Sequence, residues 1–212
     1  TRLEGSASID GAGAVTIVDG KDKGSYSTDK IMIATGSHAS SLPGITIDEK
    51  RIVSSTGALS LDKCPKKLLV IGAGYIGLEL GTVWARLGAE VEVIEFLPRI
   101  LPGMDDEIAK KFLAIAKKQG VSFRLSTAVK AAKTSKTGVS LTVEPAAGGA
   151  AETVTADIAL VSVGRHPATD GLGLEAAGIS LTERGRIAVD SRFETSLDDV
   201  FAIGDVIDGP ML

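Results

Sequence analysis

Cysteine is nearly absent from this 212-residue chain, which contains only Cys64. A single cysteine cannot form an internal disulfide, and no histidine or second cysteine lies near it in the sequence. We therefore expect Cys64 to be an incidental thiol in a protein of a reducing compartment.

Aromatic residues and clusters of positive charge are also scarce. Phe, Trp and Tyr make up 4% of the sequence, and the net charge is −4, so we expect neither a base-stacking surface nor a nucleic-acid partner. No apolar run is long enough to cross a bilayer, and the first residues lack the order of a signal peptide, so we expect no membrane association. The remaining composition, 44% hydrophobic and 24% charged, is typical of a globular domain.

Neither end of the chain has the features of a natural terminus. Thr1-Arg2-Leu3 has no initiator methionine, and Gly209-Pro210-Met211-Leu212 has neither a helix cap nor a polar tail. We expect the chain to be part of a longer protein.

A glycine-rich stretch, residues 67–79, organises the chain. An apolar run typical of a buried parallel strand leads into Gly72-Ala73-Gly74-Tyr75-Ile76-Gly77, and a helical pattern follows. Gly72 permits a tight turn, Gly74 allows a pyrophosphate to approach the backbone, and Gly77 allows the helix to pack on the strand. The first N–H groups of that helix would face the phosphates. The pattern predicts a dinucleotide site, with a purely structural strand–turn–helix as the alternative.

An acidic residue at the end of the next strand refines this prediction. The strand at 90–94 ends in Glu95, about twenty residues beyond the turn, where a carboxylate accepts hydrogen bonds from an adenosine ribose. A helix opening at Asp105 and a strand at 121–125 complete a β-α-β-α-β unit. Glu79 is either an acid that stabilises the helix N-terminus or a residue near the far end of the dinucleotide.

Helical spacing predicts which side chains of these two helices are buried. The expected core residues are Leu78, Val83 and Leu87 in the first helix, and Ile108, Phe112 and Ile115 in the second. Gly88 and Gly120 are expected to end the helices, and Ser54-Ser55-Thr56 offers candidate caps for a short helix through Leu59.

Three further apolar strands end in small or acidic residues. They are 30–34 with Thr35-Gly36-Ser37, 158–163 with Gly164, and 200–204 with Asp205. Carboxyl ends of parallel strands meet at a ligand crevice, where Asp205 could accept hydrogen bonds from ligand hydroxyls. Ordinary strand-end turns are the alternative. The strand at 30–34 is expected to be central in its sheet, and residues 139–143 and 187–190 are expected to be strands.

Five motifs stand in a fixed order along the chain. They are Ala34 to Ser37, Gly72 to Glu79, Val91 to Arg99, Val163 to Pro167 and Thr195 to Asp205. Together they resemble the two-dinucleotide-binding-domain flavoprotein disulfide reductases, and most closely the members that oxidise dihydrolipoamide. The resemblance covers essentially the whole chain.

The resemblance implies an α/β fold in which a Rossmann-like NAD-binding domain, a parallel sheet plus a β-meander, is inserted into an FAD-binding domain. Residues 1–54 would close the FAD-binding domain, 55–167 would be the NAD-binding domain, and 168–212 would be the return segment. The positions that match NAD contacts are Gly72, Ala73, Gly74, Tyr75, Ile76, Gly77, Leu78, Glu79, Glu95, Val129 and Gly164. Those that match FAD contacts are Thr35, Gly36, Ser37, Asp205, Met211 and Leu212. Glu95 favours NAD over NADP because a carboxylate repels a 2′-phosphate.

The chain also departs from the family. It lacks the glycine fingerprint for FAD, the CxxxxC redox pair, and the dimerisation domain with its His–Glu pair; Cys64, His38 and His166 match none of these positions. We therefore expect no catalytic residue and no metal site in this chain, and no activity from it alone. The longer enzyme is expected to pass electrons from dihydrolipoamide through a disulfide and FAD to NAD+.

The resemblance also implies partners. The longer protein would be a homodimer, the lipoyl-oxidising component of 2-oxo acid dehydrogenase or glycine cleavage complexes, with lipoyl domains as substrate, in bacterial cytoplasm or the mitochondrial matrix. A sister flavoprotein disulfide reductase, an NADH oxidase, or a non-catalytic dinucleotide-binding module are the alternatives.

Overall fold

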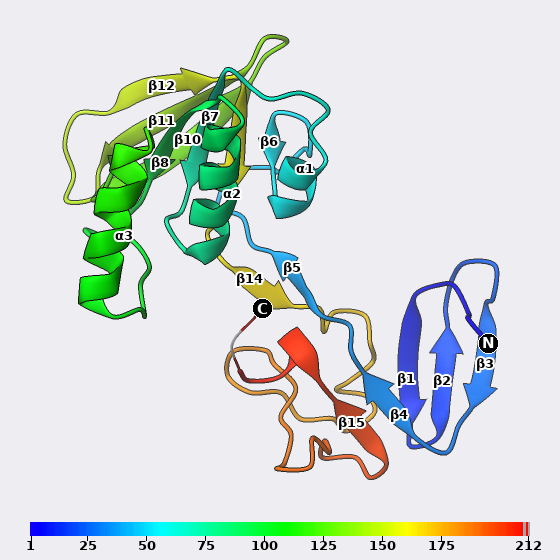
Figure 1. Ribbon diagram of the computed structural model, residues 1–212. Helices are drawn as coiled ribbons and strands as arrows, with labels where there is room; N and C mark the ends of the chain where they lie inside the picture. Colours follow the sequence, from blue (N-terminus) through cyan, green and yellow to red (C-terminus); the bar gives the residue numbers. More distant parts are fainter. Residues whose placement is uncertain (210, 212) are drawn as a thin grey trace. The chain divides into compact units, whose positions relative to one another are not determined.

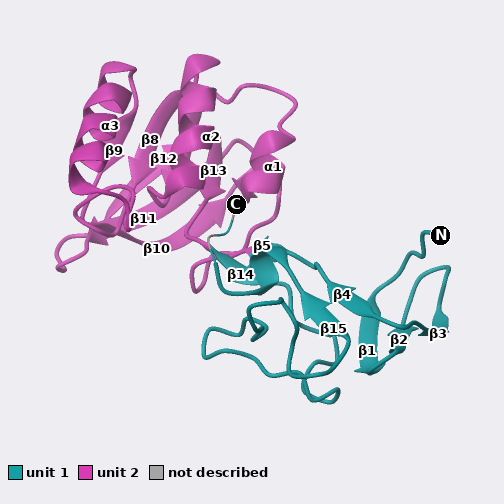
Figure 2. Ribbon diagram, turned by 60° about the horizontal axis from the view of Figure 1, so that its bottom comes forward, with its two compact units in different colours: residues 1–38, 165–212 teal, residues 39–164 magenta. Residues whose placement is uncertain are grey.

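The computed structural model describes residues 1–209 and 211, which form two compact units (Figure 1). Unit 1 comprises residues 1–38 and 165–212, and unit 2 comprises residues 39–164 (Figure 2). The segment 39–54 belongs to unit 2 because β6 (Ile52–Val53) pairs with a strand of that unit and Ile45 packs in its core. The units therefore divide at 38/39 and 164/165, whereas the cofactor domains are expected to divide at 54/55 and 167/168. The assignment of cofactors to domains stays a prediction.

The centre of unit 2 is a five-stranded parallel sheet in the order β6-β13-β7-β8-β9. Its other strands are β7 (Lys67–Ile71), β8 (Glu90–Ile94), β9 (Ser122–Arg124) and β13 (Ile158–Val161). The middle strand, β7, is buried on both faces, since its four apolar residues are at most 3% exposed. This is the pattern of a central parallel strand, and the predicted parallel α/β sheet is confirmed.

Three helices pack on one face of this sheet: α1 (Ser55–Leu59), α2 (Tyr75–Arg86) and α3 (Asp106–Lys118). Ser54 caps α1, its Oγ accepting from the Thr56 N–H at 3.1 Å, and Asp105 caps α3 by accepting from the Glu107 N–H at 2.9 Å. Gly88 follows Leu87, the C-cap of α2, and has φ +106°, the left-handed conformation expected there. The helix positions predicted from the sequence are confirmed.

The predicted buried faces of α2 and α3 are partly wrong. Leu78 is 2% exposed, but Val83 and Leu87 are 48% and 61% exposed. In α3 the fully buried side chains are Ala109 and Ala116, Phe112 is partly buried, and Ile108 and Ile115 are each 52% exposed. The physical reason is that the helices lie close to the sheet, so small residues face it. Gly81 is an example, because a Cβ on it would already lie 3.6 Å from the Val70 and Val91 side chains.

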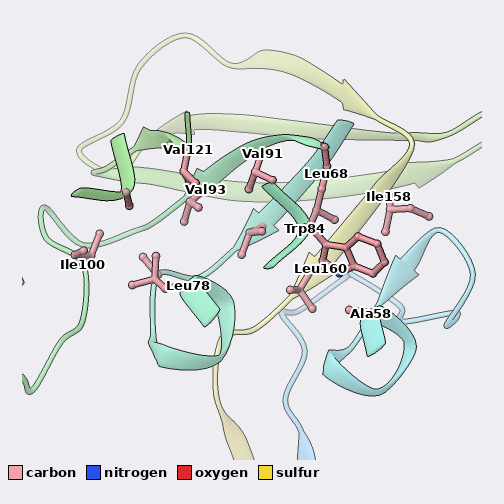
Figure 3. Close-up of a cluster of buried hydrophobic side chains, with 14 of the residues drawn as sticks. Ala58, Leu68, Leu78, Trp84, Val91, Val93, Ile100, Val121, Ile158 and Leu160 are labelled. Atoms are coloured by element: carbon pink, nitrogen blue, oxygen red, sulfur yellow. The ribbon is translucent and has the colours of Figure 1, made fainter. Parts of the chain in front are cut away.

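The core beneath these helices gathers branched side chains from the sheet around Trp84 (Figure 3). Leu68 and Val70 of β7 point into this cluster, while Leu69 and Ile71 belong to a second cluster on the opposite face. A three-stranded antiparallel meander supplies that second cluster. Its strands are β10 (Thr127–Thr134), β11 (Val139–Pro145) and β12 (Glu152–Ala156). The strand predicted at 139–143 is confirmed.

Unit 1 contains an antiparallel meander, a parallel pair of strands, a second two-stranded sheet and one 3-10 turn. The elements are β1 (Ala7–Gly11), β2 (Ala14–Ile17) and β3 (Gly24–Ser27), then β4 (Ile31–Ile33) with β15 (Val200–Ala202), β5 (Ser37–Ala39) with β14 (Arg165–Pro167), and η1 (Gly204–Val206). Its core includes Ile31, Ile33, Ile187 and Val200.

Two predictions in unit 1 are wrong. Among the described residues β4 pairs only with β15, and Met32 is 64% exposed, so this strand buries one face rather than two. The strand expected at 187–190 is reduced to isolated bridges at Ile187. A turn closed by the Thr182 N–H to the Arg186 carbonyl precedes it, and the Asp190 carboxylate binds the N–H groups of the next turn, so no ladder can extend. In the part of the chain that the structure describes, no helix is long and apolar enough to cross a membrane.

Candidate functional site

The glycine turn between β7 and α2 has a backbone that only glycine accommodates at its first position. Gly72 has φ +101°, and its N–H donates to the Ile94 carbonyl at 2.9 Å. A Cβ on Gly72 would lie 2.6 Å from the carbonyl oxygen of Ser162, the residue that follows β13. The turn is therefore held between the ends of two neighbouring strands, as a tight strand-to-helix turn requires.

The other two glycines of the fingerprint differ sharply in their surroundings. A Cβ on Gly77 would lie 2.3 Å from the Gly72 carbonyl oxygen and 2.5 Å from Ser162 Oγ, so Gly77 lets α2 close onto the turn. A Cβ on Gly74 would meet nothing within 4 Å. Gly74 is the N-cap of α2 and supplies no side-chain cap. The open space thus lies at the helix N-terminus, where N–H groups lack intrahelical partners.

Glu95 is tied directly to this turn. It is 8% exposed, and its Oε2 accepts from the Ala73 N–H at 2.6 Å while its Oε1 accepts from the Leu97 N–H at 2.8 Å. Each carboxylate oxygen has a second lone pair, so the group can still accept hydrogen bonds from a ligand. The Ala73 N–H, in contrast, is already occupied.

The remaining residues predicted to contact NAD lie at varied depths. Tyr75 and Glu79 are exposed and Ile76 is partly buried, whereas Leu78 packs in the core, so only its backbone faces the turn. Val129 is partly buried on β10, and Gly164 follows β13 with φ +131°. All members of the predicted NAD set belong to unit 2.

Ser162 is a supporting residue that the sequence did not reveal. Its hydroxyl donates to two carbonyl oxygens, that of Ile71 at 3.0 Å and that of Gly72 at 3.2 Å. Ser162 stands at the end of β13, the strand beside β7. A polar residue interrupting the apolar run 158–163 was the available signal.

A charge network crosses three strands of the same sheet. The buried Glu92 carboxylate pairs with Arg124 and lies 3.4 Å from Lys67 Nζ. The hydrogen bond that Arg124 donates to Glu92 raises the pKa of Arg124, and the hydrogen bond that Lys67 donates to Glu90 raises the pKa of Lys67. These pairs link neighbouring strands and are structural. No group of three or more metal-ligating side chains occurs among the residues that the structure describes.

Four of the residues predicted to contact FAD lie in unit 1, just beyond the ends of β4 and β15: Thr35, Gly36, Ser37 and Asp205. Thr35 Oγ1 donates to the Ala168 carbonyl at 2.7 Å, and the Ala168 N–H donates to the Gly36 carbonyl at 2.9 Å. Ser37 Oγ donates to Asp205 Oδ2 at 2.5 Å. Met211 is partly buried. Leu212 lies outside the described residues.

Arg165 joins this cluster, although the sequence did not single it out as a site residue. Its Nε donates to Ser37 Oγ at 2.6 Å and its Nη2 to the Ser37 carbonyl at 2.5 Å, while Asp205 Oδ2 lies 3.8 Å from Nε. A guanidinium, a hydroxyl and a carboxylate therefore form one network. The position of Arg165 in the motif Val163 to Pro167 was the only hint.

Comparison with known families extends these observations. Residues 2–212 match the model of the pyridine nucleotide-disulphide oxidoreductase family. The mitochondrial dihydrolipoyl dehydrogenase of Pisum sativum is 56% identical over 200 residues, which cover 94% of this chain and 38% of that protein. Leghemoglobin reductase of Glycine max is 55% identical, over 94% of this chain and 37% of that protein. The chain thus spans less than two fifths of the length of these relatives.

Solved structures of the same kind are similar throughout the chain. The HOCl-induced flavoprotein disulfide reductase RclA from Escherichia coli matches with a TM-score of 0.87 and 31% identity, over 99% of this chain and 46% of that one. LpdA from Mycobacterium tuberculosis matches with a TM-score of 0.82 and 28% identity, over 94% of this chain and 42% of that one.

Proposed function

Because the chain belongs to the pyridine nucleotide-disulphide oxidoreductase family, whose members use FAD and NAD(P), we propose that it supplies the NAD-binding portion of a dihydrolipoyl dehydrogenase. The observation that carries this proposal is the contact of Glu95 with the glycine turn, because it sets a ribose-binding carboxylate beside a phosphate-binding helix N-terminus. In the complete enzyme a bound NAD+ would supply the hydride acceptor, and the residues around the glycine turn would hold it.

Unit 2 binds the dinucleotide in this proposal. The start of α2 would hold the pyrophosphate beside Gly74, where a Cβ would meet open space. Its N–H groups would donate hydrogen bonds, and the positive end of the helix dipole would stabilise the negative charge. Glu95 accepts hydrogen bonds from the adenosine ribose through its remaining lone pairs and repels a 2′-phosphate, which selects NAD over NADP. Gly72, Gly77 and Ser162 hold the turn in shape.

Unit 1 supplies part of the flavin site. Asp205, oriented by Ser37 and Arg165, accepts hydrogen bonds from flavin hydroxyls, and Thr35-Gly36-Ser37 forms a small-residue edge that a cofactor can approach. Met211 and Leu212 lie on the stretch assigned to the flavin by resemblance.

A redox-active disulfide needs two cysteines, and this chain has one, the exposed free thiol Cys64. In this proposal the dithiol chemistry is therefore performed by residues outside these 212. We propose that the 212 residues alone do not oxidise dihydrolipoamide, and that the complete enzyme does so as a homodimer within 2-oxo acid dehydrogenase or glycine cleavage complexes. Relatives named as mitochondrial enzymes favour the mitochondrial matrix, and the bacterial cytoplasm is the alternative that the resemblance implies.

Two alternatives remain in view. The identity to a relative named leghemoglobin reductase, 55%, is close to the 56% identity to a dihydrolipoyl dehydrogenase. The structural likeness extends to another flavoprotein disulfide reductase. A sister reductase or an NADH oxidase therefore shares the binding features argued above. A non-catalytic dinucleotide-binding module would also share these binding features, but the full-length protein would then contain no redox-active disulfide.

Calorimetry of the purified chain with NADH and with NADPH tests the binding proposal. We expect saturable NADH binding and much weaker NADPH binding; equal affinities would refute the role of Glu95. Turnover of dihydrolipoamide by the full-length gene product tests the substrate. An enzyme that reduces other disulfides but not lipoamide would point to a sister reductase.

A further inference from the structure

Two imidazoles stand next to each other in the small sheet of unit 1. His38 lies on β5 and His166 on β14, which are hydrogen-bonded neighbours. The ring centroids are 5.7 Å apart with an interplanar angle of 49°, and both residues are exposed. These are the only two histidines in the sequence.

This separation suits a shared metal ion. Bonds of about 2.0–2.1 Å from a metal to an imidazole nitrogen put the ion roughly 3.2 Å from each ring centroid. Two such rings then have centroids roughly 5.2 Å apart on a tetrahedral ion and roughly 6.4 Å apart as trans ligands. The observed 5.7 Å lies between these values.

The strands that carry the two rings are held together independently of any ion. Arg165 donates to both the hydroxyl and the carbonyl of Ser37, and the Ala168 N–H donates to the Gly36 carbonyl at 2.9 Å. Successive side chains of a strand point to opposite faces. His38 and His166 are therefore on the face opposite to Ser37 and Arg165, and their chemistry is separate from that of the proposed flavin cluster.

We propose that His38 and His166 form a bidentate site for a divalent transition-metal ion. Neutral imidazole favours Cu2+, Ni2+ and Zn2+, with Cu2+ bound most tightly, whereas Mg2+ and Ca2+ prefer oxygen ligands. No third metal-ligating side chain completes a group in the described part of the chain, so solvent fills the remaining positions.

The bound ion links β5 to β14. Such a pair is preformed only in the folded chain, so the ion stabilises the fold in proportion to its saturation. Two ligands on one scaffold also make the second bond intramolecular, which raises affinity about 100-fold over a single imidazole.

The test is calorimetric titration of the chain with NiCl2 and with ZnCl2 at pH 7.5. Cys64 is replaced by Ser in every sample, because an exposed thiol is itself a metal ligand. We expect one ion per chain, and about 100-fold weaker binding in both His38→Gln and His166→Gln. Lys136→Gln, an exposed change elsewhere, is the matched control and should bind as the unaltered chain does.

Full affinity in either histidine variant would overturn the proposal, as would a stoichiometry other than one. Should a variant fail to fold, the unaltered chain still gives an answer. Substoichiometric Ni2+ should broaden the imidazole proton signals of His38 and His166 together in the NMR spectrum. Broadening of only one ring, or of neither, would contradict a shared site.

Discussion

The carboxylate of Glu95 accepts a hydrogen bond from the backbone N–H of Ala73, 22 residues earlier in the chain, at 2.6 Å. This contact gives Glu95 two tasks, because the same group that would bind a ribose also fixes the glycine turn that would bind the phosphates. The second task could not be predicted from the motif, which only places an acid about twenty residues beyond the turn.

Replacing Glu95 should separate these tasks. Glu95→Ala leaves the buried Ala73 N–H without a partner, and we expect a loss of about 1–3 kcal/mol in the free energy of unfolding together with loss of NADH binding. Glu95→Gln retains an acceptor and should lose less stability. Denaturant unfolding and calorimetry measure the two effects. A variant Glu95→Ala that is as stable as the parent would show that the contact is unimportant to the turn.

Arginine at the same position should reverse nucleotide preference. In Glu95→Arg a positive side chain replaces the negative one beside the ribose, so NADPH should bind more tightly than NADH. The ratio of the two dissociation constants is the measurement. An unchanged ratio would mean that the 2′ position of the ribose lies away from residue 95.

Two glycine substitutions form a matched pair. Gly77→Ala places a Cβ 2.3 Å from the Gly72 carbonyl oxygen, and we expect it to destabilise unit 2 by about 1–3 kcal/mol or more. Gly74→Ala meets open space at φ −74°, which alanine adopts readily, so stability should hold or rise slightly. NADH affinity should nevertheless fall, because the methyl group occupies the place assigned to the pyrophosphate. Unchanged NADH affinity in Gly74→Ala would move the ligand elsewhere.

Arg165 should stabilise unit 1. Arg165→Ala removes two charge-assisted hydrogen bonds to Ser37. A hydrogen bond of this kind typically contributes about 1.5–3 kcal/mol to the free energy of unfolding. Arg165→Lys should recover only part of the loss, since an ammonium lacks the planar fork. Hydrogen exchange of the amides in β5 and β14 reports the change. Equal protection in the parent and in Arg165→Ala would contradict the role given to Arg165.

Asp48 should contribute stability that depends on pH. Burial alone would raise the pKa of Asp48, but hydrogen bonds from the Ile52, Lys50 and Arg51 N–H groups outweigh it and leave the pKa below 3.8. A folded pKa below the unfolded value means that the contribution is complete above about pH 4 and is lost as the pH falls further.

Thermal unfolding between pH 3 and pH 7 tests the behaviour of Asp48. The parent should exceed Asp48→Asn in stability by about 1 kcal/mol at neutral pH, and the difference should shrink in acid. The exposed Asp62→Asn change is the control and should show no such trend. A difference between parent and Asp48→Asn that is constant with pH would contradict the account.

The parallel sheet, its helices and their caps could be predicted because each has a local signal: an apolar run in β7, Asp105 before α3, Gly88 after α2. The buried faces could not, because helical spacing shows where side chains lie but not how closely a helix approaches. Small residues at Gly81, Ala109 and Ala116 bring the helices near the sheet and leave the larger Val83, Leu87 and Ile108 at the surface.

The candidate site shows the same division. The motif located Gly72, Gly74 and Gly77, whose backbone requirements are local. Ser162 and Arg165 act on partners 90 and 128 residues away. The local signals, a polar residue in an apolar run and a place in a motif, do not identify those partners. The expected strand at 187–190 failed for a related reason, because side-chain hydrogen bonds of Asp190 competed with strand pairing.

The central claim is that NAD binds at the glycine turn of unit 2. An NMR titration of the isotope-labelled chain with NADH tests it most directly, since every amide reports separately. The account predicts that the largest shifts fall on the amides of Gly74 to Gly77 and on Leu97, whose N–H is bound by Glu95. Saturable shifts confined to other segments, with the turn unaffected, would contradict it.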